Sequence, residues 1–164
     1  MRTELFNVNQ DIEPIEAIAR KAFSATPDSS VEQWFSFTEM VKAIHEEKGA
    51  CVLALSDDNE ILGMTYAQQE NPINGNEGIE KWVIVIAAVN PEHAGKGVGS
   101  KILGKLEEYA HSKGARKMFV YTNKGDDGVV NFYKKNGYED AGWIKDYQYG
   151  KGNSAVFLLK YLEN

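Results

Sequence analysis

The seven residues Val83–Val89 are all apolar, and five of them are β-branched. A run of this length and composition is typical of a strand that is buried on both faces of a sheet. Pro91 ends the run, and three glycines then lead into a segment with helical periodicity. The chain is therefore organised around a buried strand, a glycine-rich loop and a helix that begins where the loop ends.

The glycine-rich loop has the composition of an anion site. An apolar stripe with helical spacing covers residues 98–109. Gly95 and Gly97 precede this stripe, and Gly99 lies in its first turn. Glycines let a ligand approach the backbone closely, and the N–H groups of a helix's first turn have no intrahelical partners. This arrangement typically binds phosphate. A tight strand-to-helix turn that binds nothing explains the three glycines about equally well.

The charge distribution favours the anion site. Carboxylates occupy the starts of the other three predicted helices, whereas this helix has none before Glu107 and carries Lys96 and Lys101. Because a helix N-terminus attracts negative charge, its positive end is free for a ligand. Two common phosphate motifs fail: Leu106 stands where a P-loop needs Ser or Thr, and Ser100 stands where the dinucleotide fingerprint needs glycine.

Periodicity and turn residues predict the remaining elements. Ser29 and Glu32 have capping-box spacing at the start of the second helix. A polar loop is expected over 70–79. The predicted elements are a strand 3–8, helices 12–23 and 31–48, strands 50–56, 60–69 and 80–89, a helix 98–113, a strand 116–122, a helix 126–135, and strands 138–147 and 155–162. This order predicts one α/β domain, residues 1–164, with helices on both faces of a sheet.

Composition excludes several classes of protein. Cys51 is the single cysteine of the chain, so no internal disulfide and no cysteine-rich zinc site can form, which fits a reducing cytoplasm. The net charge of −6 argues against a general nucleic-acid binder. No stretch is long and apolar enough for a membrane span, and the acidic first twenty residues do not form a signal peptide. We expect a cytoplasmic protein without a metal, a nucleic-acid partner or a membrane partner.

The loop also matches a family signature. The segment 89–99 resembles the signature of the GNAT superfamily of acetyl-CoA-dependent N-acetyltransferases, in which Arg/Gln-x-x-Gly-x-Gly/Ala follows a strand that ends in a Val-x-Pro-like segment. Ala94 departs from the signature, because it occupies the Arg/Gln position. Any pyrophosphate contact from that side chain is lost, and Lys96 or the main chain would have to replace it.

A second motif of the same family follows about 30 residues later. Its pattern is Asn-x-x-Ala-x-x-Leu/Phe-Tyr and then Gly-Phe/Tyr, and the segment 126–138 resembles it. Asp126 replaces Asn and Val129 replaces Ala, whereas Phe132 and Tyr133 match. Two motifs in this order are far more specific than either one, and the resemblance covers nearly the whole chain.

The resemblance implies a fold and an activity. The fold is a mixed, mostly antiparallel sheet of about seven strands. The activity is direct transfer of the acetyl group of acetyl-CoA, the co-substrate, to a primary amine of a small molecule or peptide. Tyr133 corresponds to the general acid for the leaving thiolate. The residues expected at the cofactor, with main-chain donors at the first two, are Ala88, Val89, Ala94, Gly95, Lys96, Gly97, Val98, Gly99, Ser100, Asp126, Val129 and Phe132.

The attacking amine must lose a proton. An alkylamine with a pKa of about 10.4 costs about 4.6 kcal/mol to hold neutral at pH 7. In some family members a Glu on the buried strand is the base, and Val83 occupies that position here. The alternatives are Glu80, Glu92, His93 and a water path. Glu80 is preferred, although only a local bulge could bring it to the face of Val83.

The aromatic residues of the last hairpin have two explanations. Trp143, Tyr147 and Tyr149 lie near Asp146 in the sequence, and aromatic rings beside a carboxylate can hold a cationic amine. Packing of the hairpin on a second subunit of a homodimer explains them equally well. Asp146 and Tyr147 are also distant candidates for the base.

The departures from the two motifs are also compatible with a second function. Ala94, Asp126 and the apolar Val83 are compatible with a catalytically idle acyl-CoA-binding module. A transferase that uses a longer acyl group has the same sequence signature as an acetyltransferase.

Overall fold

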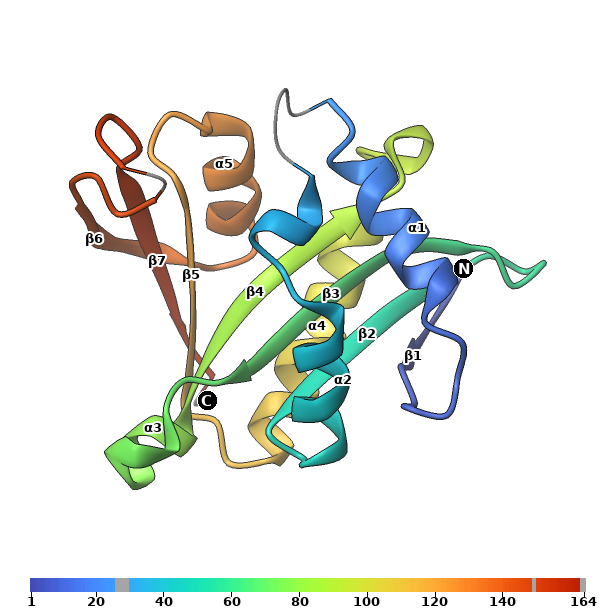
Figure 1. Ribbon diagram of the computed structural model, residues 1–164, viewed down its shortest axis with the longest axis horizontal. Coiled ribbons are helices and arrows are strands. Elements are labelled where there is room, and N and C mark those ends of the chain that lie inside the picture. Colours follow the sequence, from blue (N-terminus) through green and yellow to red (C-terminus); the bar gives the residue numbers. More distant parts are fainter. Residues whose placement is uncertain (26–29, 149, 163–164) are drawn as a thin grey trace.

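The computed structural model describes residues 1–25, 30–148 and 150–162 (Figure 1). Its centre is a sheet of seven strands in the order β1-β2-β3-β4-β5-β7-β6. All neighbouring strands are antiparallel except β4 and β5, which are parallel. This confirms the expected mixed, mostly antiparallel sheet. The strands are β1 Arg2–Leu5, β2 Gly49–Leu55, β3 Ile61–Gln69, β4 Lys81–Val89, β5 Lys117–Asn123, β6 Glu139–Ile144 and β7 Ala155–Tyr161.

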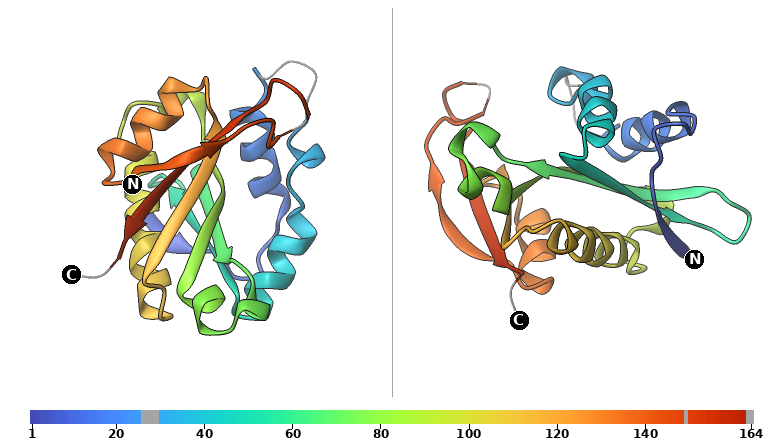
Figure 2. Two further views of the ribbon diagram at one scale, coloured as in Figure 1. Left: turned by 90° about the vertical axis from the view of Figure 1, so that its left-hand side faces the viewer. Right: turned by 90° about the horizontal axis from the view of Figure 1, so that it is seen from below.

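Helices cover both faces of the sheet (Figure 2). On one face α1 contacts β3 and β4, and α2 contacts β2. On the other face α4 contacts β2, β3 and β4, and α5 contacts β7. The helices are α1 Glu13–Ala22, α2 Phe37–His45, α3 Asn76–Glu80, α4 Val98–Ser112 and α5 Asp127–Lys135, with 3-10 turns at Val31–Gln33, Pro72–Asn74 and Pro91–His93.

The strand β4 contributes to both cores because it contains a β-bulge. Ile84 and Ile86 lie opposite consecutive residues of β3, so Val85 is an extra residue in β4. The side chain of Ile84 consequently packs in the core under α4, whereas that of Ile86 packs in the core under α1 and α2. The continuous apolar run of the sequence thus serves two layers in turn.

The strands β4 and β5 separate at the same point. Their last paired residues are Ile84 and Val120. Beyond this pair β4 continues beside β3 and β5 continues beside β7, and the two strands diverge (Figure 1). A V-shaped opening in the sheet results, at the carboxyl ends of both strands.

The second helix differs from its prediction. The sequence predicts one continuous helix, but a 3-10 turn at Val31–Gln33 is followed by a break, and α2 begins at Phe37 with Ser36 as its N-cap. Phe35 lies in the break and packs edge-on against Phe37, with 4.9 Å between ring centroids. Aromatic packing on the sheet therefore outweighs local helix preference. Ser29, the expected cap, lies outside the described residues.

Two further differences lie at turns. The expected polar loop over 70–79 contains the short helix Asn76–Glu80. The expected strand 138–147 ends at Ile144, because Asp146 has a φ of 53° and its Oδ1 accepts a hydrogen bond of 2.7 Å from the N–H of Gly152. This contact bends the chain into the last hairpin before the predicted strand is complete.

Gly104 lies inside α4 and offers a test of helix stability. A Cβ built at Gly104 meets no atom within 4 Å. Because glycine inside a helix costs about 1 kcal/mol relative to alanine, Gly104→Ala should raise the free energy of unfolding by roughly 0.5–1 kcal/mol. Urea denaturation followed by circular dichroism measures this change. A lower stability of the variant would show that α4 does not pack as described.

Candidate active site

The glycine-rich loop joins the end of β4 to the start of α4. Gly95 and Gly97 have φ angles of 74° and 80°, in the region that favours glycine. Gly97 is the N-cap residue of α4, and among the described residues no side chain caps this terminus. The N–H groups of Val98, Gly99 and Ser100 therefore lack helical partners and point out of the helix end. A phosphate group can accept hydrogen bonds from this donor set.

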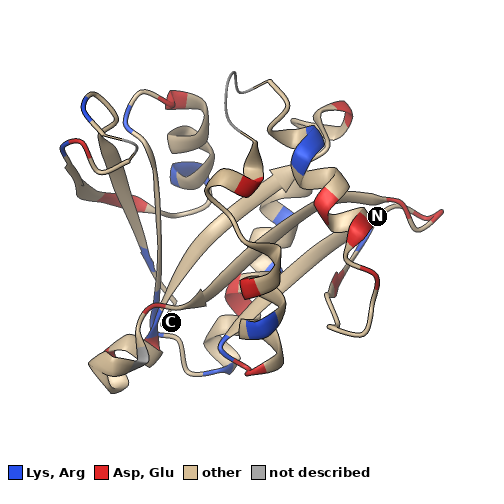
Figure 3. Ribbon diagram, viewed as in Figure 1, with Lys and Arg blue, Asp and Glu red and all other residues tan. Residues whose placement is uncertain are grey.

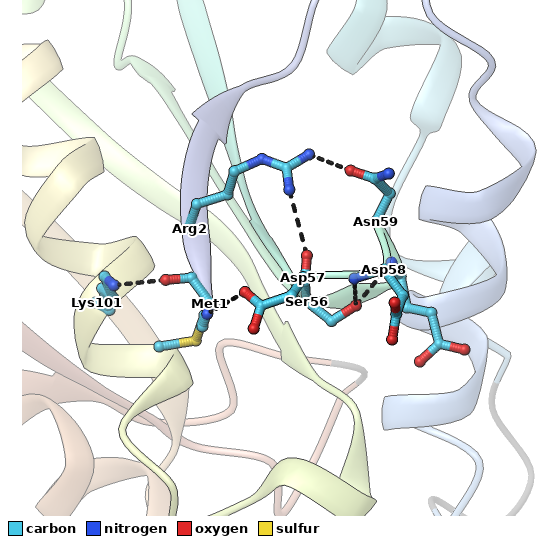
Figure 4. Close-up of polar contacts among 8 residues, drawn as sticks. Met1, Arg2, Ser56, Asp57, Asp58, Asn59 and Lys101 are labelled. Atoms are coloured by element: carbon cyan, nitrogen blue, oxygen red, sulfur yellow. Dashed lines mark hydrogen bonds and ion pairs between the residues drawn. The ribbon is translucent and has the colours of Figure 1, made fainter.

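Charge at this terminus differs from that of the other helices. The first turn of α1 contains Glu13, and red segments mark acidic residues on this helix in Figure 3, whereas the first turn of α4 contains no acidic residue. Lys101 is turned away from the helix end, since its Nζ donates to the carbonyl of Met1 at 3.0 Å (Figure 4). Lys96 forms no ion pair within the described part of the chain. Lys96 is thus the lysine that is available to an anion.

The opening between β4 and β5 exposes one edge of β4. The N–H of Asn90 donates to the carbonyl of Leu62 in β3 at 2.8 Å. Because N–H groups alternate between the two edges of a strand, that of Ala88 also points toward β3, whereas those of Ala87 and Val89 point into the opening. The Val89 N–H therefore points into the site, as expected. The expectation for Ala88 is wrong, because its N–H points toward β3, and the second N–H that points into the opening is that of Ala87.

Helix α5 lies against the start of α4. A Cβ built on Gly99 would be 3.1 Å from the ring of Phe132, and Val129 packs in the same core. Asp126 is the N-cap of α5: its Oδ1 accepts a hydrogen bond of 3.1 Å from the N–H of Val129. Three residues expected at the cofactor thus lie on one helix beside the glycine-rich loop, and the carboxylate of Asp126 is engaged in capping.

Tyr133 lies on the α4 side of the sheet and is only 3% exposed. Its ring centroid is 5.0 Å from that of Phe132 and 5.3 Å from that of Tyr138. Burial raises the pKa of Tyr133, so the hydroxyl keeps its proton at neutral pH. Within the described part of the chain, no hydrogen bond occupies this hydroxyl.

A hydrogen-bonded cluster fixes the end of α5. The hydroxyl of Tyr138 donates to Glu107 Oε1 at 3.0 Å, and Lys160 Nζ donates to Glu107 Oε2 at 2.6 Å and to the carbonyl of Asn136 at 3.0 Å. Because Glu107 is on α4 and Lys160 on β7, the cluster sets the position of α5, and with it that of Tyr133. The sequence contains no signal for this cluster, since its members come from three separate segments of the chain.

Glu80 is not brought to the site. It is the last residue of α3 and precedes β4, whose nine residues at about 3.3 Å each separate it from Val89 by about 30 Å. Its Oε2 lies 3.6 Å from Arg116 Nη1. The bulge at Val85 lies beyond Val83, so it does not move Glu80 to the face of Val83. The expectation of Glu80 as the base is corrected on these grounds.

The other candidate bases differ in their surroundings. Glu92 Oε1 is 2.9 Å from Lys21 Nζ, and this contact lowers the pKa of Glu92 and weakens it as a base. His93 follows on the same 3-10 turn, and its buried Nδ1 has no partner within the described residues. Asp146 belongs to the turn of the last hairpin. Tyr149 lies outside the described residues.

The sequence profile of the Acetyltransferase (GNAT) family matches residues 11–138. This chain belongs to the GNAT family of acetyltransferases. The family expected from the two motifs is thereby confirmed, and the glycine-rich loop and α5 are those of a GNAT domain.

Two curated relatives are similar to this chain over part of their own length. It is 31% identical over 61 residues to an uncharacterized N-acetyltransferase of Methanocaldococcus jannaschii, a match that covers 35% of this chain and 27% of that protein. It is 24% identical over 159 residues to a mycothiol acetyltransferase of Arthrobacter sp., covering 90% of this chain and 45% of that protein. The chain thus spans less than half the length of either relative.

Solved structures share the GNAT fold. A ribosomal-protein-alanine N-acetyltransferase from Brucella melitensis aligns with a TM-score of 0.80 and 16% identity over 98% of this chain and 99% of that one. An aminoglycoside 6'-N-acetyltransferase complexed with coenzyme A aligns with a TM-score of 0.77 and 16% identity over 100% and 98%. At these identities the likeness establishes the fold.

Membrane-spanning helices and metal sites are absent from the described part of the GNAT chain. No helix in residues 1–25, 30–148 and 150–162 is long and apolar enough to cross a membrane. Over the same ranges, no three His, Cys, Asp or Glu side chains gather in a way that would hold a metal ion. Cys51 is buried in β2, and burial raises its pKa, so its thiol belongs to the core.

Proposed function

We propose that this GNAT domain transfers the acetyl group of acetyl-CoA to the nitrogen of a primary amine, on a small molecule or a peptide, by direct attack in a ternary complex. The separation of β4 from β5 carries the proposal. It leaves the Val89 N–H unpaired immediately before a loop whose own N–H groups suit a pyrophosphate. A donor for a carbonyl and donors for an anion therefore lie on consecutive segments.

Each step of the proposed reaction has a group in this chain. The N–H groups at the start of α4, with Lys96, hold the pyrophosphate. The amine nitrogen attacks the thioester carbon, and the Val89 N–H donates to the carbonyl oxygen as negative charge develops there. When the C–S bond breaks, the sulfur takes the proton of the Tyr133 hydroxyl, which solvent then restores.

The amine loses its proton to a group or a water molecule near the carboxyl end of β4. Glu80 is about 30 Å away along β4, and Glu92 is paired with Lys21. Of the four nearby routes, Glu80, Glu92, His93 and water, His93 and ordered water are the two left. His93→Gln distinguishes them: loss of the acidic limb of the pH–rate profile assigns the proton to His93, and an unchanged profile assigns it to water.

The names of the relatives support a nitrogen acceptor. The structural neighbours include an aminoglycoside 6'-N-acetyltransferase and a ribosomal-protein-alanine N-acetyltransferase. Both names specify acetylation of nitrogen, although their acceptors differ in size and charge. We therefore assign an amine acceptor to this chain as part of the proposal.

Turnover of acetyl-CoA against a panel of amines tests the proposal. Release of the free thiol is expected in the presence of an acceptor amine, and mass spectrometry should show a product heavier by one acetyl group. A competition between acyl-CoAs of different length in the same assay defines the acyl group. Tight binding of acetyl-CoA by calorimetry without turnover of any amine would instead identify an idle acyl-CoA-binding module.

Ala94 offers a test of the pyrophosphate position. It is exposed and stands where the family signature has Arg or Gln. Ala94→Arg should lower KM for acetyl-CoA about five- to tenfold, because a charge-assisted hydrogen bond contributes about 1.5–3 kcal/mol before the cost of ordering the side chain. Ala94→Met, of similar length but neutral, is the control. An equal KM for both variants would place the pyrophosphate elsewhere.

The localisation and the oligomeric state of the protein are two further predictions. We expect the protein to act in the cytoplasm, in line with its single buried cysteine. A homodimer formed through the last hairpin is the second, and sedimentation velocity at micromolar concentrations tests it.

A further inference from the structure

We infer that the acceptor is a single amine carried on an apolar body with a neutral or anionic far end, and that this body lies along the face of β5 and β7 that faces away from α4 and α5. The inference rests on the proposed acetyl transfer and specifies its substrate class. It excludes polycationic amines as good acceptors.

The apolar face follows from the pairing of β5 with β7. Met118 and Val120 point into the core under α4, so Phe119 and Tyr121 point to the opposite face. Their partners on β7 are Leu159 and Phe157, respectively. On this face α1 and α2 cover β2, β3 and β4 (Figure 2). Four large side chains of β5 and β7 thus form an apolar strip beside the helices.

A groove of about 410 Å³ lies over this strip, within the range of small-ligand sites. Its apolar wall includes Phe119, Phe157, Leu159 and, from β6, Ile144. Ile144 is 46% exposed although it is an apolar side chain, and its pairing with Ala155 puts it on the face of Phe157. An apolar or aromatic body that lies in the groove would bury these surfaces.

The strip leads to the opening between β4 and β5. Tyr121 is the first residue of β5 after its last pair with β4. Its ring centroid is 5.1 Å from that of Tyr147 and 5.4 Å from that of Phe157, which also lines the groove. A ligand in the groove therefore has a continuous aromatic path to the opening. Its amine enters from the face opposite Tyr133, so nucleophile and acid lie on different sides of the thioester.

Charge at the far end of the groove sets the sign that the ligand can carry. The groove is lined there by Glu70, Lys81 and Lys117. Lys81 Nζ lies 2.6 Å from Glu70 Oε2, and this contact balances its charge within the groove, whereas Glu77, whose Oε1 lies 3.8 Å from Lys81 Nζ, is not a lining residue. Lys117 has no ion pair in the described part of the chain, and the neighbouring Glu80 is paired with Arg116, as described above.

Lys117, which has no ion pair among the described residues, lies four residues before Tyr121, a separation of about 13 Å between the two backbone positions along β5. A second cation on the acceptor at that distance from its amine would meet a like charge. A carboxylate there would meet an opposite charge. The groove should therefore prefer an acceptor whose far end is anionic over one whose far end is neutral, and should bind an acceptor with a cationic far end least well.

Three matched amines test the inference: 4-phenylbutylamine, the same molecule with a para carboxylate, and the same molecule with a para aminomethyl group. We expect kcat/KM to be at least tenfold higher for the carboxylate than for the diamine. Lys117→Met should reduce this ratio to within about twofold. Lys105→Met, on α4 on the other side of the sheet, is the matched control and should leave the ratio unchanged.

A second variant tests the groove itself. Ile144→Ala should raise KM for 4-phenylbutylamine at least fivefold and leave kcat within about twofold, because the side chain contacts the body of the acceptor and not its nitrogen. Leu5→Ala removes an exposed apolar side chain from the opposite edge of the sheet and serves as the control. Thermal melting of both variants verifies that they fold.

The outcomes separate the inference from the proposed function. Turnover that is fastest with the diamine, or a KM unaffected by Ile144→Ala, overturns the inference and leaves acetyl transfer standing. Absence of turnover with every amine, polycations included, overturns the proposed function and the inference together.

Discussion

Tyr133→Phe is expected to lower kcat by a factor of at least about 100 and to leave KM for acetyl-CoA within about threefold. The substitution removes one oxygen from a buried ring whose edge contacts, to Phe132 and Tyr138, are apolar and stay in place. Without the hydroxyl, the thiolate leaves unprotonated. Steady-state assays of thiol release with a fixed amine measure both constants.

The pH dependence sharpens this prediction. Burial raises the pKa of Tyr133, which means that the folded enzyme keeps the hydroxyl protonated well above pH 9. The ratio of wild-type to variant kcat should therefore be constant between about pH 6 and pH 9. A ratio that falls toward one as the pH rises through this range would show that the Tyr133 hydroxyl loses its proton there, and would contradict the effect of burial on its pKa.

Tyr109→Phe is the matched control for the hydroxyl deletion. Tyr109 lies on α4, and its ring contacts Trp82 on the side of the helix near its carboxyl end. Loss of this hydroxyl should change kcat less than twofold. A loss of activity below threefold in Tyr133→Phe would assign Tyr133 to packing alone.

Ser100→Asp is expected to stabilise the fold and to weaken acetyl-CoA at the same time. Ser100 is exposed in the first turn of α4, where a carboxylate interacts favourably with the helix dipole by roughly 0.3–1 kcal/mol. The same carboxylate would stand among the N–H groups assigned to the pyrophosphate. We expect Kd for coenzyme A to rise at least tenfold by calorimetry, while the midpoint of thermal unfolding rises or stays constant.

The neutral isostere separates charge from shape in this experiment. Ser100→Asn has nearly the same size, so its effect on Kd should be less than threefold. Raising the ionic strength should narrow the difference between Asp and Asn, because exposed charges are screened by salt. Equal Kd values for the two variants at low salt would mean that no anion docks at the start of α4.

The parts of the site that could be predicted are those set by local sequence. Gly95 and Gly97 need positive φ angles, and the absence of a carboxylate at the start of α4 is visible in the sequence itself. Asp126 and Phe132 fall on a helix whose motif fixes their spacing. These residues meet because two short segments follow neighbouring strands of one sheet.

The parts that could not be predicted depend on contacts between distant segments. The start of α2 is decided by Phe35 against Phe37 and the sheet, and no capping pattern encodes it. The direction of the Ala88 N–H depends on pairing with β3. The position of Glu80 also depends on such contacts, because counting along an apolar strand gives neither the position of a bulge nor the end of the strand at which an ion pair forms.

The extra residue Val85 implies an unusual pattern of tolerance to mutation. Exchange of Val85 for another β-branched residue keeps the length of β4 and should be accommodated. Deletion of Val85 would place Ile86 directly after Ile84, keep the pairing and facing of residues 86–89 against β3, and remove the irregularity at which β4 leaves β5, so that β4 could stay paired with β5. One codon lost here would close the sheet, so the length of this strand, more than the identity of any side chain in it, keeps room for a substrate.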